Sequence, residues 1–422
     1  MEEDFMKTNA IPNRRLVQRR ILLLCWLSYA LSYLCRTNLS IALPQMTAEF
    51  EWNTAAAGAI GSGFFVSYGL GHLVSGILGD RLSAKKFMAI GLFGTSLCNL
   101  LMGFFPNYIV IFSVWLLNGL FLSTLWGPIV RVIAAWFSPS ERNFPAVLVS
   151  LSSMVGYLIS WAGLGIVIQL TGWRGAFFLP GSITLVFTLW FCLRMEASPK
   201  CLGLEDFSFN QPENEEPEPP TRVPLWKLVR KEHLLSFCIA AAAQGIVKDG
   251  ITLWEPTILT GLHHASSTEV SIFSSLIPLF SLLGVILSGR LMSRFCGREK
   301  KPGILLFAAC GLCCILFYFL MGRFLWLDAA FFSVISSLLM GVNTLLLTFL
   351  PLRFSVYGRA SGVAGLFNFC AYLGAGCSGI FSGFLADLGG WSTTVLLWLI
   401  LCIVGLTAIW TGFRKTTPAP QK

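Results

Sequence analysis

Long apolar runs alternate with short polar segments along almost the whole chain. About twelve of these runs reach the roughly 20 residues that a helix needs to cross a bilayer. They predict membrane-spanning helices with the approximate limits 17–46, 55–79, 86–106, 108–136, 144–170, 174–194, 233–261, 268–294, 303–322, 324–352, 359–388 and 391–413.

One polar segment separates these runs into two sets of six. Residues 196–226 are acidic, rich in proline and poor in apolar side chains, which is typical of a solvated loop. We therefore expect an N-terminal six-helix bundle in residues 1–195, a linker in 196–230 and a C-terminal six-helix bundle in 231–422.

The composition agrees with an all-α membrane protein. Of the 422 residues, 55% are hydrophobic and only 12% are charged, and the mean hydropathy is +0.71. A soluble domain carries about 25% charged residues. The apolar segment at the N-terminus is too long for a cleaved signal peptide, so we expect it to remain in the protein as a span.

The net charge of +9 is unevenly distributed between the predicted loops. Lysine and arginine gather in alternate loops, whereas the opposite loops hold little more than Arg174 and Arg323. By the positive-inside rule, both termini are then cytoplasmic, which requires an even number of spans. We expect a multi-pass, monomeric protein of the cell membrane, whose basic charge reflects its topology and not a nucleic-acid partner.

The thirteen cysteines indicate neither disulfides nor a metal site. Nearly all lie inside the apolar runs, where a free cysteine behaves as a small hydrophobic residue. Cys310, Cys313 and Cys314 have CxxC spacing, but no second pair of cysteine or histidine residues lies nearby in the sequence. We expect no metal and no cofactor.

Two cations interrupt the apolar runs at matching places in the two halves. Arg36, in YLCRTNLSIALP, precedes Pro44 by eight residues, and Lys248, in KDGITLWEP, precedes Pro256 by eight. A charge at the centre of a spanning helix costs roughly 2.5–3.5 kcal/mol on insertion scales, so each needs a compensating function or partner. Together with the GW pairs at 172–173 and 390–391, the match indicates an internal repeat, typical of transporters with a site between their halves.

The loop GILGDRLSAKK resembles the signature between the second and third helices of the major facilitator superfamily. Within it, the chain is most similar to the organophosphate:phosphate antiporters, which include glycerol-3-phosphate and hexose-phosphate transporters. The segments that carry this resemblance are YLCRTNLSIALP, FVSYGLGHLVSG, TLWGPIVRVIAAWFSPSER, DGITLWEPTIL and GRASGVAGLFNFCAYLGAG. It implies twelve helices in two pseudo-symmetric six-helix bundles.

The resemblance also implies that Arg36 and Lys248 line a central cavity. Arg36 matches the family's phosphate-binding arginine, and Lys248 stands where a second arginine is usual. Two opposed cations would neutralise a phosphate group, and a guanidinium adds a bidentate fork. The alternative is that each cation belongs to a structural ion pair. For Lys248, Asp249 should point about 100° away on a helix, so Glu255, roughly two turns on, is the better candidate partner.

Other side chains are candidates for the same site. His72 follows Tyr68 by one helical turn and adds a titratable group near a position where glycerol-phosphate relatives carry lysine. The span-five histidine of those relatives is absent, and Ser152 and Ser153 occupy its region. We expect Tyr33, Tyr68, His72 and Trp126 to contribute to binding. Weaker candidates are Asn38, Tyr157, Trp254, Asn368 and Tyr372.

Asp80 and Arg81 lie at a predicted helix end, where an aspartate can pair with basic residues and hold one conformation closed. We expect them to act in gating and not in binding. The glycine-rich segments GAIGSGFF and GAGCSGIFSG should permit close helix approach.

These features predict a secondary transporter that exchanges a phosphate ester for inorganic phosphate by alternating access. Two alternatives remain: a proton-coupled carboxylate symporter of the same fold, with Asp249, Glu255 or His72 titrating, and a membrane sensor of sugar phosphates. An enzyme is not expected, because the sequence contains no set of nucleophile and base.

Overall fold

The described part of the chain consists of helices joined by short loops. The computed structural model describes residues 14–79, 83–138, 141, 143–203, 225–295, 299–354 and 360–415, and no strand occurs in these ranges. The first half contains α1 (Arg14–Phe50), α2 (Thr54–Gly79), α3 (Ala84–Phe104), α4 (Tyr108–Leu122), α5 (Trp126–Trp136), α6 (Asn143–Thr171), α7 (Gly175–Arg194) and the short helix η1 (Pro199–Leu202).

The second half opens with the short helix α8 (Leu225–Lys231). It continues with α9 (Leu234–His263), α10 (Ser267–Ser274), α11 (Leu276–Arg294), α12 (Lys300–Leu320), α13 (Leu325–Thr344), the π-helical turn η2 (Leu345–Phe349), α14 (Leu350–Leu352), α15 (Ala360–Gly389) and α16 (Trp391–Lys415). Most of the predicted linker, residues 196–230, falls outside the described residues, so the division of the chain at its limits stays a prediction.

The predicted spans match these helices. Within the described residues, ten segments are long and apolar enough to cross a membrane. α1 and α2, with 37 and 26 residues, complete the predicted twelve. α1 carries the polar run Arg36 to Asn38 near its centre, so it is less apolar than the other long helices.

Two predicted spans are broken within the apolar run. The span 108–136 breaks between α4 and α5, and the span 268–294 breaks between α10 and α11. In each case a proline, Pro128 or Pro278, lies in the first turn of the second piece. Proline has no backbone N–H to donate, and its ring clashes with the carbonyl group four residues earlier, so the preceding turn is interrupted.

The two halves repeat the same helix pairing. In the first half α1 packs on α6, α2 on α4 and α3 on α7, and in the second half α9 packs on α15, α11 on α13 and α12 on α16. These are the first and fifth, second and fourth, and third and sixth spans of each half. Gly172 and Gly390 end the two fifth spans, and both adopt the same left-handed φ of 74°. The internal repeat predicted from the sequence is therefore confirmed as two pseudo-symmetric bundles.

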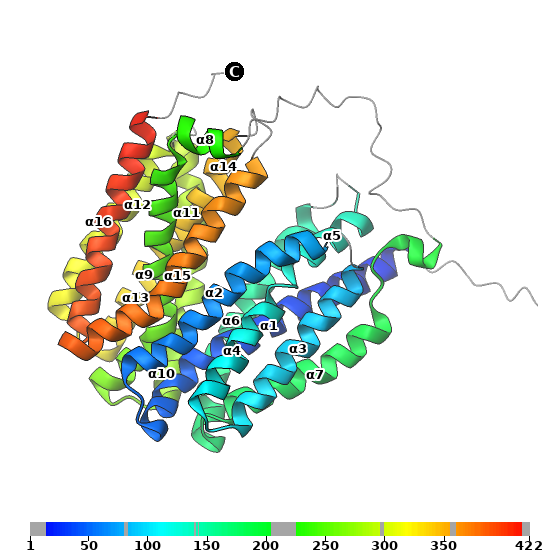
Figure 1. Cartoon of the computed structure of the whole chain (residues 1–422), viewed down its shortest axis with the longest axis horizontal. Coiled ribbons are helices and arrows are strands. Elements are labelled where there is room, and N and C mark those ends of the chain that lie inside the picture. The colour runs from blue at the N-terminus through cyan, green and yellow to red at the C-terminus, as the bar shows by residue number, and fades with distance from the viewer. Residues whose placement is uncertain are drawn as a thin grey trace, which may run out of the picture.

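Three pairs of helices form most of the contact between the two halves. α2 packs along α15, α6 along α10, and α1 beside α9 (Figure 1). We call the end that carries loops 51–53, 172–174 and 264–266 the far end, and the end that carries η1 and α8 the linker end. Figure 1 shows the two bundles close together toward the far end and diverging toward the linker end.

Glycines allow close approach of α2 and α15. A Cβ atom added to Gly58 would overlap the carbonyl oxygen of Gly379, and one added to Gly383 would meet the backbone of Thr54. The close helix approach predicted for the two glycine-rich segments is therefore confirmed.

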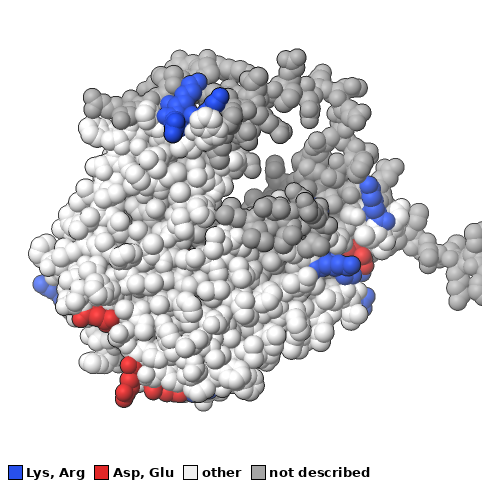
Figure 2. Space-filling model, viewed as in Figure 1, with Lys and Arg blue, Asp and Glu red and all other residues white. Residues whose placement is uncertain are grey.

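Charged side chains separate between the two ends of the molecule. On the face in Figure 2, lysine and arginine gather toward the linker end, while aspartate and glutamate are concentrated toward the far end. At the far end, Arg174 forms an ion pair of 2.8 Å with Glu49, so one of the few basic residues there is neutralised. The charge asymmetry predicted from the loops is therefore present in the folded molecule.

Candidate functional site

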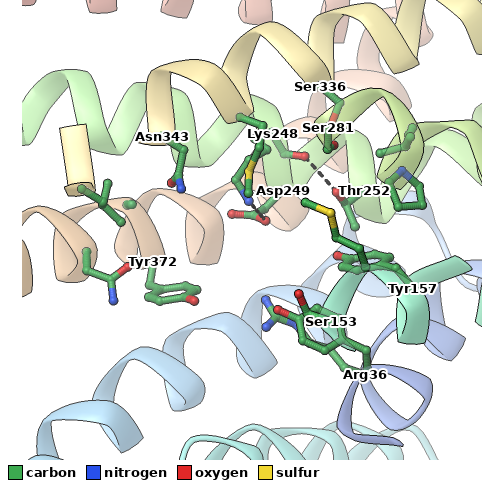
Figure 3. A pocket seen from close by; sticks show the side chains of 18 residues that line it. Arg36, Ser153, Tyr157, Lys248, Asp249, Thr252, Ser281, Ser336, Asn343 and Tyr372 are labelled. Atoms are coloured by element: carbon green, nitrogen blue, oxygen red, sulfur yellow. Dashed lines mark hydrogen bonds and ion pairs between the residues drawn. The ribbon is translucent and has the colours of Figure 1, made fainter. Parts of the chain in front are cut away.

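A cavity of about 220 Å³ lies between the two halves (Figure 3). From the first half it is lined by residues of α1 and α6, and from the second half by residues of α9, α11, α13, η2 and α15. The lining residues are Tyr33, Arg36, Ser153, Met154, Tyr157, Lys248, Asp249, Thr252, Ile277, Pro278, Ser281, Ser336, Met340, Asn343, Leu347, Asn368, Ala371 and Tyr372. Both predicted cations are in this set.

Arg36 projects from the middle of α1 and is held by aromatic rings. Its guanidinium carbon lies 4.7 Å from the ring centre of Tyr68 and 5.4–5.6 Å from those of Phe64, Phe65 and Tyr33. Among the described residues, no carboxylate forms an ion pair with it. Aromatic faces attract a cation but bring no negative charge of their own. The cavity therefore contains a positive charge that lacks an anionic partner within the described protein.

Lys248 has a partner, and it differs from the one expected. Its Nζ lies 2.6 Å from Oδ1 of Asp249 (Figure 3), so the expectation that this neighbour points away is wrong. The helical offset of about 100° separates the two Cβ atoms, but the four-carbon stem of lysine is long enough to turn back to the carboxylate. The preference for Glu255 as the partner is also wrong. Glu255 is fully buried, and no ion pair joins it to a described cation.

Polar side chains of the second half complete the cavity wall. Thr252, Ser281, Ser336, Asn343 and Asn368 line it and offer hydroxyl and amide groups. Of these five residues, only Asn368 was predicted from the sequence. Serine and threonine are common in packed membrane helices, so their presence alone does not indicate a binding site. Thr252 could have been predicted, because it follows Lys248 by four residues and therefore lies on the same face of α9.

Ser153 also lines the cavity, beside Tyr157 (Figure 3). It lies in the region where the sequence lacks the histidine of glycerol-phosphate relatives. The first-half wall therefore combines one arginine with tyrosine and serine hydroxyls.

Three predicted site residues lie behind the wall. Tyr68 packs against Arg36, and His72 stacks on Tyr372, with ring centres 5.9 Å apart. Trp126 packs on Tyr29, which in turn contacts Tyr33. None of the three predicted residues is part of the described lining.

Two weaker candidates belong to helix packing. Asn38 donates to Oδ1 of Asn99 at 2.7 Å and to the carbonyl oxygen of Ala176 at 2.9 Å, which ties α1 to α3 and α7. Trp254 is fully buried against Trp391. Asp80 and Arg81 lie outside the described residues, and their gating role stays a prediction.

Two cysteines of the CxxC run, Cys310 and Cys314, lie beside Cys402, which is distant in the sequence. The sulfur atoms of Cys310, Cys314 and Cys402 lie within 4.8 Å of one another between α12 and α16. All three are buried in the second bundle, and none lines the cavity. Burial of this kind is typical of free cysteines that pack as small hydrophobic residues, and the expectation of no metal stays a prediction.

The comparison with protein families agrees with this geometry. The model of the major facilitator superfamily matches residues 25–371. The chain belongs to the major facilitator superfamily. Membership of a superfamily of transporters also confirms that it is not an enzyme.

Three curated relatives match about nine-tenths of the chain. A probable hexose phosphate transport protein of Chlamydia trachomatis is 27% identical over 92% of this chain and 89% of its own length. The glycerol-3-phosphate transporter of Bacillus subtilis is 27% identical over 92% of this chain and 91% of its own. The membrane sensor protein UhpC of Escherichia coli is 27% identical over 89% of this chain and 87% of its own. The resemblance to organophosphate:phosphate antiporters is confirmed by these matches.

A solved structure shows the same superfamily fold. It is a bacterial homologue of the human lysosomal transporter Spinster, in an inward-facing and occupied conformation. It aligns with a TM-score of 0.79 and 15% identity, over 95% of this chain and 98% of the other. The fold class predicted from the sequence is thereby confirmed.

Proposed function

We propose that this protein carries a phosphate ester across the membrane in exchange for inorganic phosphate, by alternating access. The observation that carries the proposal is Arg36, a cation that lines the central cavity and has no carboxylate partner among the described residues. A phosphate group brings negative charge and several acceptor oxygens, which match the donors of a guanidinium. The names of the relatives support this class of substrate.

In this proposal Arg36 binds the phosphate group directly, and Lys248 contributes positive charge from the opposite wall. Tyr33 offers a hydroxyl group in the cavity. Tyr68, His72 and Trp126 act from behind: Tyr68 orients Arg36, His72 supports Tyr372, and Trp126 supports Tyr33 through Tyr29. We assign direct binding to Arg36, Lys248 and Tyr33 because all three line the same cavity.

The transport step follows from the charge of the cavity. A bound anion neutralises the cations and lowers the electrostatic cost of enclosing the site between the two bundles. Without an anion, enclosure leaves unneutralised positive charge in a low-dielectric space, so the empty carrier returns slowly. This charge balance is a physical reason for exchange in preference to one-way transport.

The orientation in the membrane is part of the proposal. We infer that the linker end, together with both termini, faces the cytoplasm and that the protein lies in the cell membrane, as the positive-inside rule indicates. The far end, where α2 and α15 pack closely, then forms the outer gate. Since a single chain supplies every described wall of the cavity, we infer a monomeric carrier.

The test is exchange of labelled phosphate in proteoliposomes, with a panel of phosphate esters and carboxylates as competitors. The proposal predicts that phosphate esters compete and accelerate efflux of internal phosphate, whereas carboxylates do not. Competition by carboxylates together with a requirement for a pH gradient would instead favour the proton-coupled symporter.

A sensor is the second candidate, because one relative of similar identity is named as a membrane sensor protein. A sensor would bind phosphate esters with negligible turnover. Measuring binding and exchange on the same preparation separates the two functions.

A further inference from the structure

Asp249 is a carboxylate inside the proposed anion site. It lies on α9, lines the cavity and is only 4% exposed. Its Oδ1 is 2.6 Å from the ammonium group of Lys248. A carboxylate at this place opposes the binding of any anion, so its presence requires an explanation.

The charges along the wall set the balance of the empty site. Among the lining residues described, Arg36 and Lys248 are the cations, and Asp249 is the anion. One positive charge is therefore in excess, and not the two that the sequence predicted. Because charges interact strongly at the low effective dielectric of a partly enclosed cavity, this difference changes the binding of an anion substantially.

We propose that Asp249 is a specificity-determining residue, a counter-anion that competes with the substrate for Lys248 and adjusts the site to the charge of the bound group. The inference rests on the proposed function of Arg36 and Lys248 as the anion site. An incoming phosphate group meets Arg36 with no described carboxylate paired to it. It meets Lys248 already paired, and it must share that cation with a buried carboxylate or displace the carboxylate, which is costly.

A direct consequence is selectivity by charge. A monoanion leaves the three side chains and ligand neutral in sum, whereas a dianion leaves one negative charge in excess. Removing the charge of Asp249 reverses this balance in favour of dianions. A residue with a merely structural role would change the binding of both ligands alike.

Two probes of similar shape separate these cases. Glucose 6-phosphate is a dianion at pH 8, since the second pKa of a phosphate monoester is about 6. Glucose 6-sulfate carries a single negative charge throughout. Their affinities are measured by competition with labelled phosphate in binding to the purified full chain. The variants are Asp249→Asn, Lys248→Ala and the double variant, with Asp249→Ser as a second replacement should the asparagine variant fail to fold.

The expected result for Asp249→Asn is about tenfold tighter binding of glucose 6-phosphate and a much smaller change for glucose 6-sulfate. Lys248→Ala should weaken the binding of the phosphate ester. The double variant should recover much of the wild-type affinity, because it again has one positive charge in excess.

Two outcomes would overturn the inference. One is an unchanged ratio of the two affinities in both Asp249 variants. The other is a double variant that binds no better than Lys248→Ala alone, which would show that Asp249 does not oppose the anion. Failure of the proposed function is distinguishable, because it would appear as normal phosphate binding in an Arg36→Ala variant.

Discussion

Gly58 on α2 and Gly379 on α15 face each other so closely that a Cβ on either would overlap the carbonyl oxygen of the other. The contact joins the two bundles on the far-end side of the cavity. The far end therefore closes by backbone packing, and its closure is sensitive to the smallest added side chain.

Gly379→Val should open the far end. The added side chain has no room beside Gly58, and overpacking of this kind costs typically about 1–3 kcal/mol. We expect faster hydrogen–deuterium exchange at the start of α2 and the end of α15. The control is Gly365→Val on the same helix, where nothing lies within 4 Å of an added Cβ. Equal rates of hydrogen–deuterium exchange in the two variants would contradict this account of the gate.

Asp387→Ala should also weaken the closed far end. The carboxylate of Asp387 on α15 accepts hydrogen bonds from the backbone N–H groups of Thr54 and Ala55, so it caps α2 from the opposite half. Loss of such a cap costs about 0.5–2 kcal/mol.

The matched control for this cap is Asn53→Ala. Asn53 caps the same helix from its own half, through the N–H group of Ala56. We expect both variants to lower the melting temperature. Only Asp387→Ala should raise hydrogen exchange at the end of α15, and a similar rise with Asn53→Ala would assign the effect to α2 alone.

Tyr68→Leu should disturb Arg36 without altering the described lining of the cavity. The ring of Tyr68 is the closest of the four aromatic faces around the guanidinium. A cation–π contact contributes about 0.5–2 kcal/mol, so phosphate affinity should fall by about 2- to 30-fold. Tyr68→Phe keeps the ring and should retain most of the affinity. If both variants lose it equally, the hydroxyl group and not the aromatic face supports the site.

Cys201 tests the orientation in the membrane. It is exposed in η1, just after α7 at the linker end. If that end is cytoplasmic, a membrane-impermeant maleimide should label Cys201 in inside-out vesicles and not in intact cells. Peptide mass spectrometry reads the label at this residue, and Cys201→Ser is the control. Labelling in intact cells would reverse the proposed topology.

Much of the fold could be predicted from the sequence because apolar length and loop charge are local properties. The repeat was visible for the same reason, as Arg36 and Lys248 each precede a proline by eight residues. The breaks before Pro128 and Pro278 were missed, since an apolar run continues through them.

The site was predictable only in part. A cation in an apolar run stands out, so Arg36 and Lys248 were found. The pairing of Lys248 with Asp249 depends on the rotamer of a long side chain, which spacing on a helix does not determine. The polar wall, which includes Ser281 and Ser336, depends on which helices face the cavity, and that is a property of tertiary packing.

The central claim is that the unpaired guanidinium of Arg36 binds the transported anion. Its most direct test is exchange of labelled phosphate in proteoliposomes containing Arg36→Ala, with Arg36→Lys and Arg323→Ala prepared alongside. Arg323 is exposed beyond the cavity, so its variant should exchange normally. The account predicts that Arg36→Ala abolishes exchange while Arg36→Lys, which keeps the charge but loses the fork, retains a reduced rate. Near-normal exchange by Arg36→Ala would contradict it.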